Sequence, residues 1–365
     1  MSSPRSTARL TVDLDALANN YRLLDRTAGS AEVAPVVKAD GYGLGALEAA
    51  QRLRQEGARR FFTARLGGGE ALRARLGPEP VIYVLDGCTD AEAARRLRAA
   101  DLVPALSSLE QIEIYRAEAS GGGRLTAVLH VDTGMNRLGL RPEQAADLAA
   151  RPDALAGLEL DLVMSHLACA SEPGHPMNAR QLAAFREVRA LFPDVRASLA
   201  NSGGTFLGPD YAFDLVRPGI VLYGGGPEER PDPRVQPVAT LEAEILQVRT
   251  AEPGETVGYG ASYTAPDRRT LAVIGIGYAD GVLRAHFDRR AVWFDGALRP
   301  FAGRVSMDLT TIDVTGSAAA RPGALVELFG RNRLVDDAAA DAGTLAYELL
   351  TRVGPRVDRF WRSGG

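Results

Sequence analysis

Short apolar runs separated by helix-like segments recur from residue 33 to about residue 224 of this 365-residue chain. Such an alternation is typical of repeated βα units, which build a parallel sheet. The runs occupy residues 33–39, 61–64, 81–85, 103–106, 126–131, 160–166, 196–200 and 214–216. These eight runs predict an α/β fold that begins with a (β/α)₈ barrel of the TIM type.

The segments between the runs fit helices that pack on a barrel. In residues 176–191, Leu182, Phe185, Val188 and Leu191 recur at helical spacing and form one apolar stripe. An open, doubly wound sheet would show a similar alternation. However, the Gly-x-Gly-x-x-Gly motif of a dinucleotide site does not follow the first run, so the barrel is favoured.

The sequence changes character after residue 224. Residues 224–237 are rich in Gly, Pro and charge, which predicts an exposed linker. Alternating runs follow, Asp295-Gly296 predicts a β-hairpin, and a last helix is expected over residues 336–352. We therefore predict a cofactor-binding barrel domain over residues 1–234 and a mostly-β domain over residues 235–365.

Charge and cysteine content exclude several kinds of partner. The 46 acidic and 42 basic side chains form no basic stripe, so no nucleic-acid partner is expected. No run resembles a membrane span, and residues 1–9 lack the apolar core of a signal peptide, so we expect a cytoplasmic protein. Cys88 and Cys169 lie far apart, and the histidines show no metal-ligand spacing, so no disulfide or metal site is expected.

In a (β/α)₈ barrel the active site forms at the C-terminal ends of the strands. The polar residues at or shortly after the ends of the predicted strands are Lys38, Asp132, Arg137, His166, Asn201, Ser202 and Arg217. Lys38 follows four small or apolar residues, a setting that lowers a lysine pKa and suits a Schiff-base nucleophile. By position alone, a lysine that extends its charge from a strand end into water is the more common case.

Motifs distributed over the whole chain favour the cofactor anchor. Residues 35–45, Pro-Val-Val-Lys-Ala-Asp-Gly-Tyr-Gly-Leu-Gly, closely resemble the cofactor-binding signature of the alanine racemase family. Further segments that resemble family motifs, in family order, are residues 132–139, 164–170, 201–202, 217–220, 258–263, 276–281 and 304–308. The resemblance implies a barrel followed by a β domain, with pyridoxal 5′-phosphate bound to Lys38.

The resemblance also assigns the remaining cofactor contacts. It implies that the phosphate is held by Tyr42, Ser202 and the backbone N–H groups of Gly219 and Ile220, with Asn201 and His166 in the same site. Close approach of the backbone to an anion suits a glycine.

Arg217 resembles the family arginine that faces the pyridine nitrogen. Because a guanidinium does not encourage protonation of that nitrogen, the cofactor becomes a weaker electron sink, which suppresses side reactions such as transamination. An ion pair between Arg217 and Asp214 is the structural alternative.

Racemisation needs an acid–base group on each face of the α-carbon. The resemblance implies that Lys38 serves one face and Tyr259 the other. A tyrosine of pKa about 10 is a poor base near neutral pH unless its phenolate is favoured. By family analogy His166 links Tyr259 to Arg217 and supplies that bias; alone, it would more often be a structural histidine.

The resemblance further implies a homodimer with a site shared across the interface. Tyr259, Tyr278 and the backbone of Met307 would arrive from the partner subunit to shape the substrate side. Arg137 would reach the cofactor's phenolic oxygen and the carboxylate of a small amino-acid substrate.

The chain departs from the family pattern at two positions. His130 stands where many members carry a lysine, often carbamylated, so Arg137 must be supported differently. Pro355 stands where some members place a tyrosine hydroxyl near the phosphate, which leaves one fewer potential contact.

The implied reaction is the interconversion of L- and D-alanine, joined to the cofactor as a Schiff base, which supplies D-alanine for peptidoglycan. A racemase of serine or of a broader set of amino acids is the alternative, because one methylene changes discrimination only modestly. A barrel-plus-β decarboxylase is disfavoured by chain length and by residues 258–263. A non-catalytic pyridoxal-phosphate carrier usually has the barrel alone.

Overall fold

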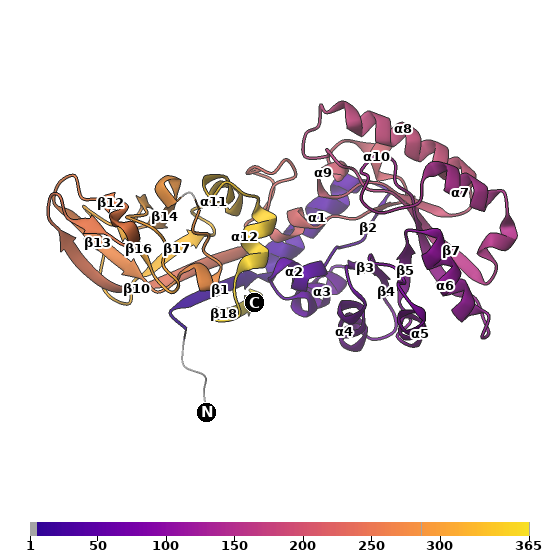
Figure 1. Cartoon of the computed structure of the whole chain (residues 1–365), viewed down its shortest axis with the longest axis horizontal. Coiled ribbons are helices and arrows are strands. Elements are labelled where there is room, and N and C mark those ends of the chain that lie inside the picture. The colour runs from indigo at the N-terminus through magenta and orange to yellow at the C-terminus, as the bar shows by residue number, and fades with distance from the viewer. Residues whose placement is uncertain (1–5, 286, 365) are drawn as a thin grey trace. The chain divides into compact units, whose positions relative to one another are not determined.

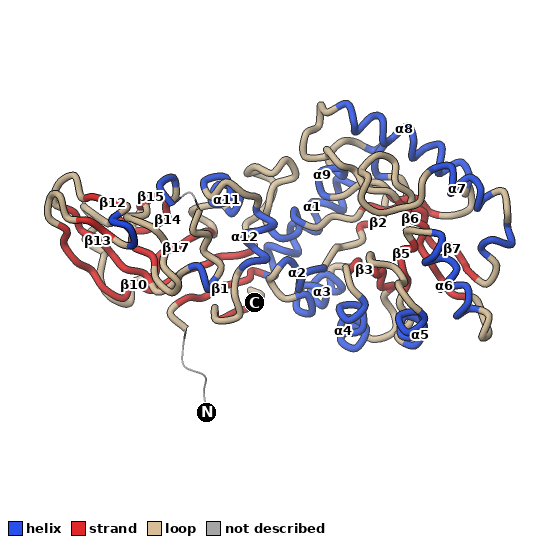
Figure 2. Tube along the Cα trace, in the orientation of Figure 1, coloured by secondary structure: helices blue, strands red, loops and turns tan. Residues whose placement is uncertain are grey.

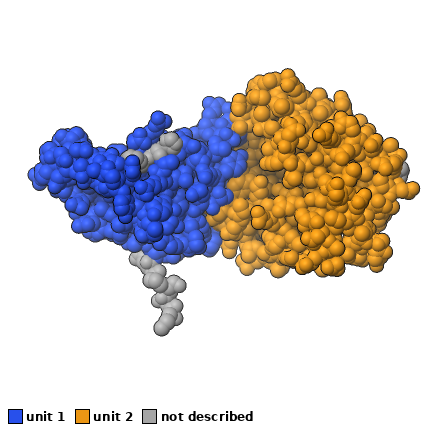
Figure 3. All heavy atoms as spheres, viewed as in Figure 1, with its two compact units in different colours: residues 1–17, 223–365 blue, residues 18–222 orange. Residues whose placement is uncertain are grey.

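The computed structural model describes residues 6–285 and 287–364, and the chain divides into two compact units. One unit comprises residues 18–222, and the other joins the residues up to Leu17 to those from Tyr223 onward (Figure 3). Within the described ranges, no helix is long and apolar enough to cross a membrane.

Parallel strands form the centre of the unit of residues 18–222 (Figure 1). Six of them pair in chain order: β3 (Arg60–Thr63), β4 (Val81–Val84), β5 (Val103–Leu106), β6 (Leu125–His130), β7 (Leu158–Met164) and β8 (Arg196–Ser198). Strand β2 (Glu32–Val33) pairs in parallel with β9 (Leu215–Val216). Backbone bonds from Phe62 N–H to Pro35 C=O (2.9 Å) and from Asp214 N–H to Ala197 C=O (3.1 Å) connect this pair to the six strands. The predicted (β/α)₈ barrel is confirmed.

Helices alternate with these strands (Figure 2). They are α1 (Leu14–Ala28), α2 (Lys38–Tyr42), α3 (Ala46–Gln55), α4 (Leu66–Leu76), α5 (Ala91–Ala99), α6 (Leu109–Ala119), α7 (Pro142–Ala149), α8 (Pro176–Leu191), α9 (Ser202–Thr205) and α10 (Pro209–Ala212). Helix α8 has the predicted bounds, and Leu182, Phe185 and Val188 of its stripe are buried. Leu191 is 38% exposed, so the buried stripe ends before the last helical residue.

The second unit is mostly β, as predicted. Strand β10 (Ala239–Ala251) lies at its centre, and its residues alternate between buried and part-exposed over the first half of the strand. The main sheet has the order β15-β14-β17-β10-β1-β18, and β13 pairs with both β10 and β16. The other strands are β1 (Ala8–Asp13), β11 (Thr256–Val257), β12 (Tyr263–Thr264), β13 (Arg269–Ile274), β14 (Ala291–Phe294), β15 (Ala297–Pro300), β16 (Thr310–Asp313), β17 (Leu325–Phe329) and β18 (Asp358–Arg362).

Strand β1 was not expected from the sequence. It precedes the barrel in the chain but pairs antiparallel with β10 and parallel with β18. The division predicted between residues 234 and 235 remains a prediction, to which the structure adds that the chain enters the β unit before it forms the barrel.

Local predictions in the β unit had mixed outcomes. The hairpin is confirmed, and positive φ values at Asp295 (49°) and Gly296 (74°) suit its two-residue turn. Residues 224–227 are buried rather than exposed, and Gly226 N–H donates to the Asp336 carboxylate at 2.8 Å. The single helix expected over residues 336–352 is wrong: α11 (Val335–Asp341) and α12 (Ala346–Arg352) are separated by Gly343, whose φ of 68° ends the first helix.

Candidate active site

Lys38 lies at the start of a left-handed turn that follows β2. The non-glycine residues Ala39, Asp40 and Tyr42 have φ values of 51°, 54° and 58°. Each such residue costs about 1–2 kcal/mol, so the turn persists only because the surrounding fold fixes it. The Asp40 carboxylate contributes by accepting the Ala46 N–H at 2.9 Å. The turn therefore fixes the backbone of Lys38 and Tyr42, two predicted cofactor residues.

The environment of Lys38 favours a neutral amine. Burial is the largest cause that lowers the pKa of Lys38, and the charges of Arg137 and Arg217 lower it further, against a smaller opposing effect of Asp86. A neutral amine is the nucleophilic form of lysine. The snorkelling lysine considered from the sequence is therefore disfavoured.

Tyr42, Ser202 and Gly219 form a cradle of small polar groups. The Ser202 hydroxyl accepts the N–H groups of Gly219 at 2.8 Å and of Val221 at 3.4 Å. A Cβ atom on Gly219 would lie 1.9 Å from the Tyr42 hydroxyl oxygen, so any other residue there would displace Tyr42 or the turn. Ile220, the next predicted contact, is buried and begins a short 3₁₀ turn that ends at Tyr223. The structure thus brings the predicted phosphate contacts to one place.

Arg217 is a buried cation, 4% exposed, whose hydrogen-bond partners are neutral. Its guanidinium donates to the Ser198 hydroxyl at 2.5 Å and to the Ser165 carbonyl, and burial lowers its pKa to about 9. The Phe62 ring centroid lies 5.9 Å from its guanidinium carbon. The carboxylate of Asp214 instead accepts the Ala197 N–H at 2.8 Å. These contacts favour a site role for Arg217 over the ion pair considered from the sequence.

His166 lies between Arg217 and Asn201. Its Nδ1 is 3.4 Å from Nη2 of Arg217, which can only donate, so Nδ1 accepts and Nε2 carries the proton. Nε2 is 3.5 Å from the Asn201 side-chain nitrogen, also a donor, because the Asn201 oxygen accepts the Gly204 N–H at 3.0 Å. A neutral imidazole accepts at one nitrogen, and with Nδ1 accepting from the charged guanidinium, Nε2 cannot also accept from Asn201. Burial, followed by the charge of Arg217, places the pKa of His166 well below its ordinary value.

Gln181 is a site-supporting residue that the sequence did not reveal. This glutamine of α8 is fully buried, and its amide nitrogen donates to the His166 carbonyl at 2.9 Å and to the Thr133 hydroxyl at 3.4 Å. Its amide oxygen accepts the Ala168 N–H at 2.8 Å. Gln181 therefore connects the loop after β6 to the loop after β7. In the sequence, the signal for this role was a polar residue, Gln181, next to the apolar stripe of residues 176–191.

The loop after β6 carries Arg137. The Asp132 carboxylate accepts the N–H groups of Gly134 and Met135, both at 2.8 Å, and Arg137 itself is exposed. At the end of β6, Nδ1 of His130 is 3.2 Å from the Ser107 hydroxyl. Burial, then the charges of Arg217 and Arg137, lowers the pKa of His130 to about 4. His130 is thus a neutral imidazole near neutral pH and supplies no negative charge to Arg137.

The remaining predicted residues lie in the β unit and are exposed: Tyr259 by 63%, Tyr278 by 39% and Met307 by 53%. Tyr278 N–H donates to the Ser306 carbonyl at 3.0 Å, and Ala279 N–H donates to the Met307 carbonyl at 3.0 Å. Tyr278 and Met307 are therefore held together. Tyr259 lies with its ring centroid 6.0 Å from the guanidinium carbon of Arg284. Its hydrogen-bond link to His166 remains a prediction.

Comparison with known proteins supports the family resemblance that the sequence motifs indicate. Residues 12–227 match the model of the alanine racemase N-terminal domain, and residues 238–361 match that of the C-terminal domain. An alanine racemase of Rhizobium meliloti (strain 1021) is 47% identical, with both chains fully covered. One of Rhodospirillum rubrum is 46% identical over 99% of this chain and 97% of the relative. The crystal structure of alanine racemase from Bartonella henselae with covalently bound pyridoxal phosphate has a TM-score of 0.93 at 36% identity, covering 98% of this chain and 100% of that one. The chain therefore belongs to the alanine racemase family.

Proposed function

We propose that this protein is an alanine racemase that interconverts L- and D-alanine with pyridoxal 5′-phosphate bound to Lys38. The observation that carries the proposal is the position of Lys38 on the left-handed turn that also holds Tyr42 beside Ser202 and Gly219. Family membership and relatives named alanine racemase support it. D-alanine made in this way would supply peptidoglycan synthesis.

The cradle fits the phosphate of this cofactor. Tyr42 and Ser202 offer hydroxyls, and the missing Cβ at Gly219 lets the Tyr42 hydroxyl lie against the backbone whose N–H group Ser202 accepts. When bound, pyridoxal phosphate disperses the negative charge that remains at the α-carbon after proton loss. Lys38 would anchor it, with Ile220 and Asn201 completing the contacts.

The chain's own residues would move the proton. Lys38 would take or return the α-proton on one face, and Tyr259 would do so on the other. Arg217 would donate a hydrogen bond to the ring nitrogen, because its neutral partners leave no carboxylate to bring a proton there. Arg137 would bind the substrate carboxylate as a charge-assisted pair.

His166 would link Arg217 to Tyr259 by hydrogen bonds. Because Nδ1 accepts from Arg217, the Nε2 proton is available to the Tyr259 oxygen. A hydrogen bond donated to that oxygen favours its charged, basic form. The chain from Arg217 through His166 would thereby activate Tyr259.

We further propose a homodimer in which Tyr259, Tyr278 and Met307 of one protomer complete the site of the other. Their exposure supports this, because large apolar side chains gathered at a surface usually meet a partner.

The enzyme would work in the cytoplasm, where its cofactor and alanine are both available, and cell fractionation would test that placement. The domain division near residue 234 belongs to the same proposal.

One experiment tests the activity. Purified holoenzyme is incubated with L-alanine in heavy water, and D-alanine and deuterium at the α-carbon are followed together. We expect both to accumulate, because a proton removed by an enzyme base exchanges with solvent before it returns. Absence of both products, in protein whose absorbance shows bound cofactor, would contradict the proposal. Faster turnover of L-serine than of L-alanine would favour the alternative racemase.

A further inference from the structure

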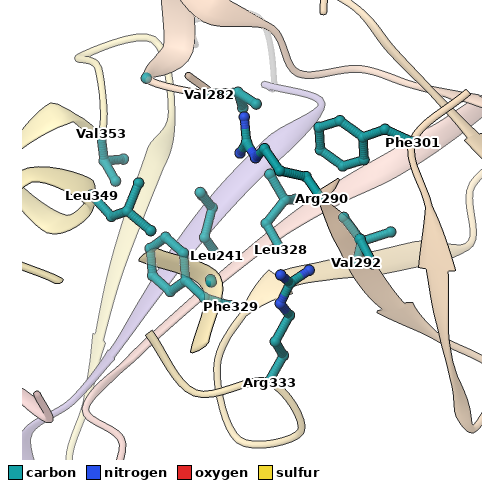
Figure 4. Close-up of a pocket in the computed structure, with 13 residues that line it drawn as sticks. Leu241, Val282, Arg290, Val292, Phe301, Leu328, Phe329, Arg333, Leu349 and Val353 are labelled. Atoms are coloured by element: carbon teal, nitrogen blue, oxygen red, sulfur yellow. The ribbon is translucent and has the colours of Figure 1, made fainter. Parts of the chain in front are cut away.

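A small pocket lies in the β unit, and none of the residues assigned to the racemase site lines it (Figure 4). Most of its wall is apolar and comes from β10, β14, β17, α12 and the residue after α12: Leu241, Val292, Leu328, Phe329, Leu349 and Val353. Two arginines, Arg290 and Arg333, share this apolar wall. Figure 4 shows both guanidinium groups at the pocket.

Both arginines are more than nine-tenths buried, with exposures of 8% for Arg290 and 4% for Arg333. Arg333 forms an ion pair with Asp341. Arg290 donates to the Leu283 carbonyl and lies over the Phe301 ring, with its guanidinium carbon 4.9 Å from the ring centroid. Within the described part of the chain, the partners of Arg290 are therefore neutral, and one carboxylate is paired with these two cations.

A buried cation without a counter-charge is costly, because the protein interior does not replace the water it has lost. Burial, and then the charge of Arg333, lowers the pKa of Arg290 to about 10, and the opposing charge of Asp341 does not offset them. In proteins, the charge of a buried cation is usually balanced by a carboxylate or by a bound anion. Asp341 pairs directly with Arg333 and acts on Arg290 only through its charge.

The size of the pocket limits the guest. The centres of water-sized particles can occupy about 20 Å³ of it, so the pocket admits only a small group. A monatomic anion fits, and the apolar wall disfavours a strongly hydrated one.

We propose that this pocket is a structural chloride site, with Arg290 as the main donor and Arg333 as the second. The ion supplies negative charge beyond that of Asp341, which pairs with Arg333. It stabilises the β unit and takes no part in proton transfer, so this inference does not depend on the proposed function.

Crystallography with bromide tests the site directly. Crystals of the holoenzyme are grown with sodium bromide in place of chloride, and anomalous scattering is recorded at the bromine edge. We expect a peak within hydrogen-bond distance of the Arg290 guanidinium. Ordered water or an empty pocket would overturn the proposal.

Thermal unfolding tests whether binding matters in solution. The holoenzyme is heated in sodium chloride from 5 to 500 mM, with sodium gluconate holding the ionic strength constant because gluconate is too large for the pocket. For a chain of this size, a hundredfold rise in a ligand that binds only the folded state, with a Kd below the lowest concentration, raises the Tm by about 3.5 °C. We expect that rise in the wild type.

Two variants test whether the rise in Tm with chloride depends on Arg290. Arg290→Met keeps a long apolar side chain but removes the cation, so its Tm should be the same at both chloride concentrations. Arg289→Met removes an exposed neighbouring charge and should keep the wild-type rise. A rise retained in Arg290→Met, or absent from the wild type despite a bromide peak, would contradict a structural role. If Arg290→Met does not fold, the bromide map and the chloride dependence of the wild-type Tm still show whether the pocket binds a stabilising anion.

Discussion

At the scale of single residues, Arg217 sets the direction of the hydrogen bonds in the site, because its guanidinium cannot accept one. A guanidinium only donates, so Arg217 makes an acceptor of the nearest nitrogen of His166 and leaves the other imidazole nitrogen protonated. Its neutral partners, Ser198 and Ser165, keep it buried without adding negative charge. The direction of the hydrogen bonds, rather than the presence of a histidine, determines what the site can activate.

Gln181 should act as a positioning residue at this scale. Gln181→Met keeps the side-chain length but removes hydrogen bonds to His166, Thr133 and Ala168, each worth about 1 kcal/mol. We expect kcat to fall about tenfold while cofactor absorbance stays unchanged, because His166 and the Arg137 loop lose a shared support. Steady-state kinetics with absorbance spectra checks this.

Asn178→Leu is the matched control for Gln181. Asn178 also lies on α8 and donates to the carbonyls of Cys169 (3.1 Å) and Glu172 (3.0 Å), beyond His166 in the same loop. An equal fall in kcat for both variants would show that general loosening of the loop, rather than the Gln181 contacts, causes the loss.

His130 should make stability depend on pH. Its pKa is about 4 in the folded chain and about 6.5 when unfolded, so the unfolded state binds more protons between these values. The free energy of unfolding should therefore fall as pH drops from 6.5 to 4, by roughly 3 kcal/mol from this residue. Urea unfolding of wild type and His130→Asn, compared across this range, measures the effect. A variant with the wild-type slope would show that His130 is not the source.

At the scale of elements, the turns after the strands hold the site. The segment after β2 adopts a left-handed turn in spite of its alanine, aspartate and tyrosine, and the segment after β9 brings Gly219 against Tyr42. These two segments are far apart in sequence but end neighbouring strands, since β2 pairs with β9. The closure of the barrel thus builds the cradle.

Gly219→Ala should damage this cradle selectively. The added methyl would overlap the Tyr42 hydroxyl, so Tyr42 or the turn must move. We expect cofactor affinity to fall at least tenfold, about 1.4 kcal/mol or more, with the fold retained. Gly67→Ala in α4, where nothing lies within 4 Å, is the control. Titration of the apoenzyme with pyridoxal phosphate measures both, and equal affinities would contradict the phosphate assignment.

The elements themselves were predictable where periodicity was strong. The stripe of α8 and the turn residues Asp295-Gly296 specify local structure through nearby residues alone. Strand β1 was missed because its partners lie more than 200 residues away. The break at Gly343 was missed because the apolar spacing continues across the turn.

The site was predictable to the extent that its residues end strands. Lys38, His166, Asn201, Ser202 and Arg217 follow from the barrel rule, and family motifs supply their roles. Their partners, such as Gln181 and Ser198, do not follow, because a hydrogen bond between distant segments leaves no periodic trace.

At the scale of the whole molecule, the proposed bases belong to different units. Lys38 lies in the unit of residues 18–222 and Tyr259 in the other. If Tyr259 acts on the partner's site, a dimer of one Lys38→Ala chain and one Tyr259→Phe chain has one intact site. Random mixing of the two chains should then restore about a quarter of wild-type activity. Co-expression and activity assay check this, and activity no higher than that of either variant alone would place both bases in one chain.

The central claim, that Lys38 and Tyr259 serve opposite faces of the α-carbon, is tested most directly by isotope exchange in Tyr259→Phe. This variant is incubated separately with L- and D-alanine in heavy water, and deuterium at the α-carbon is measured for each enantiomer. Because Lys38 remains, we predict exchange of one enantiomer at a rate well above that of the other, with racemisation reduced at least a hundredfold. Equal exchange of both enantiomers, or racemisation at the wild-type rate, would contradict the two-base account.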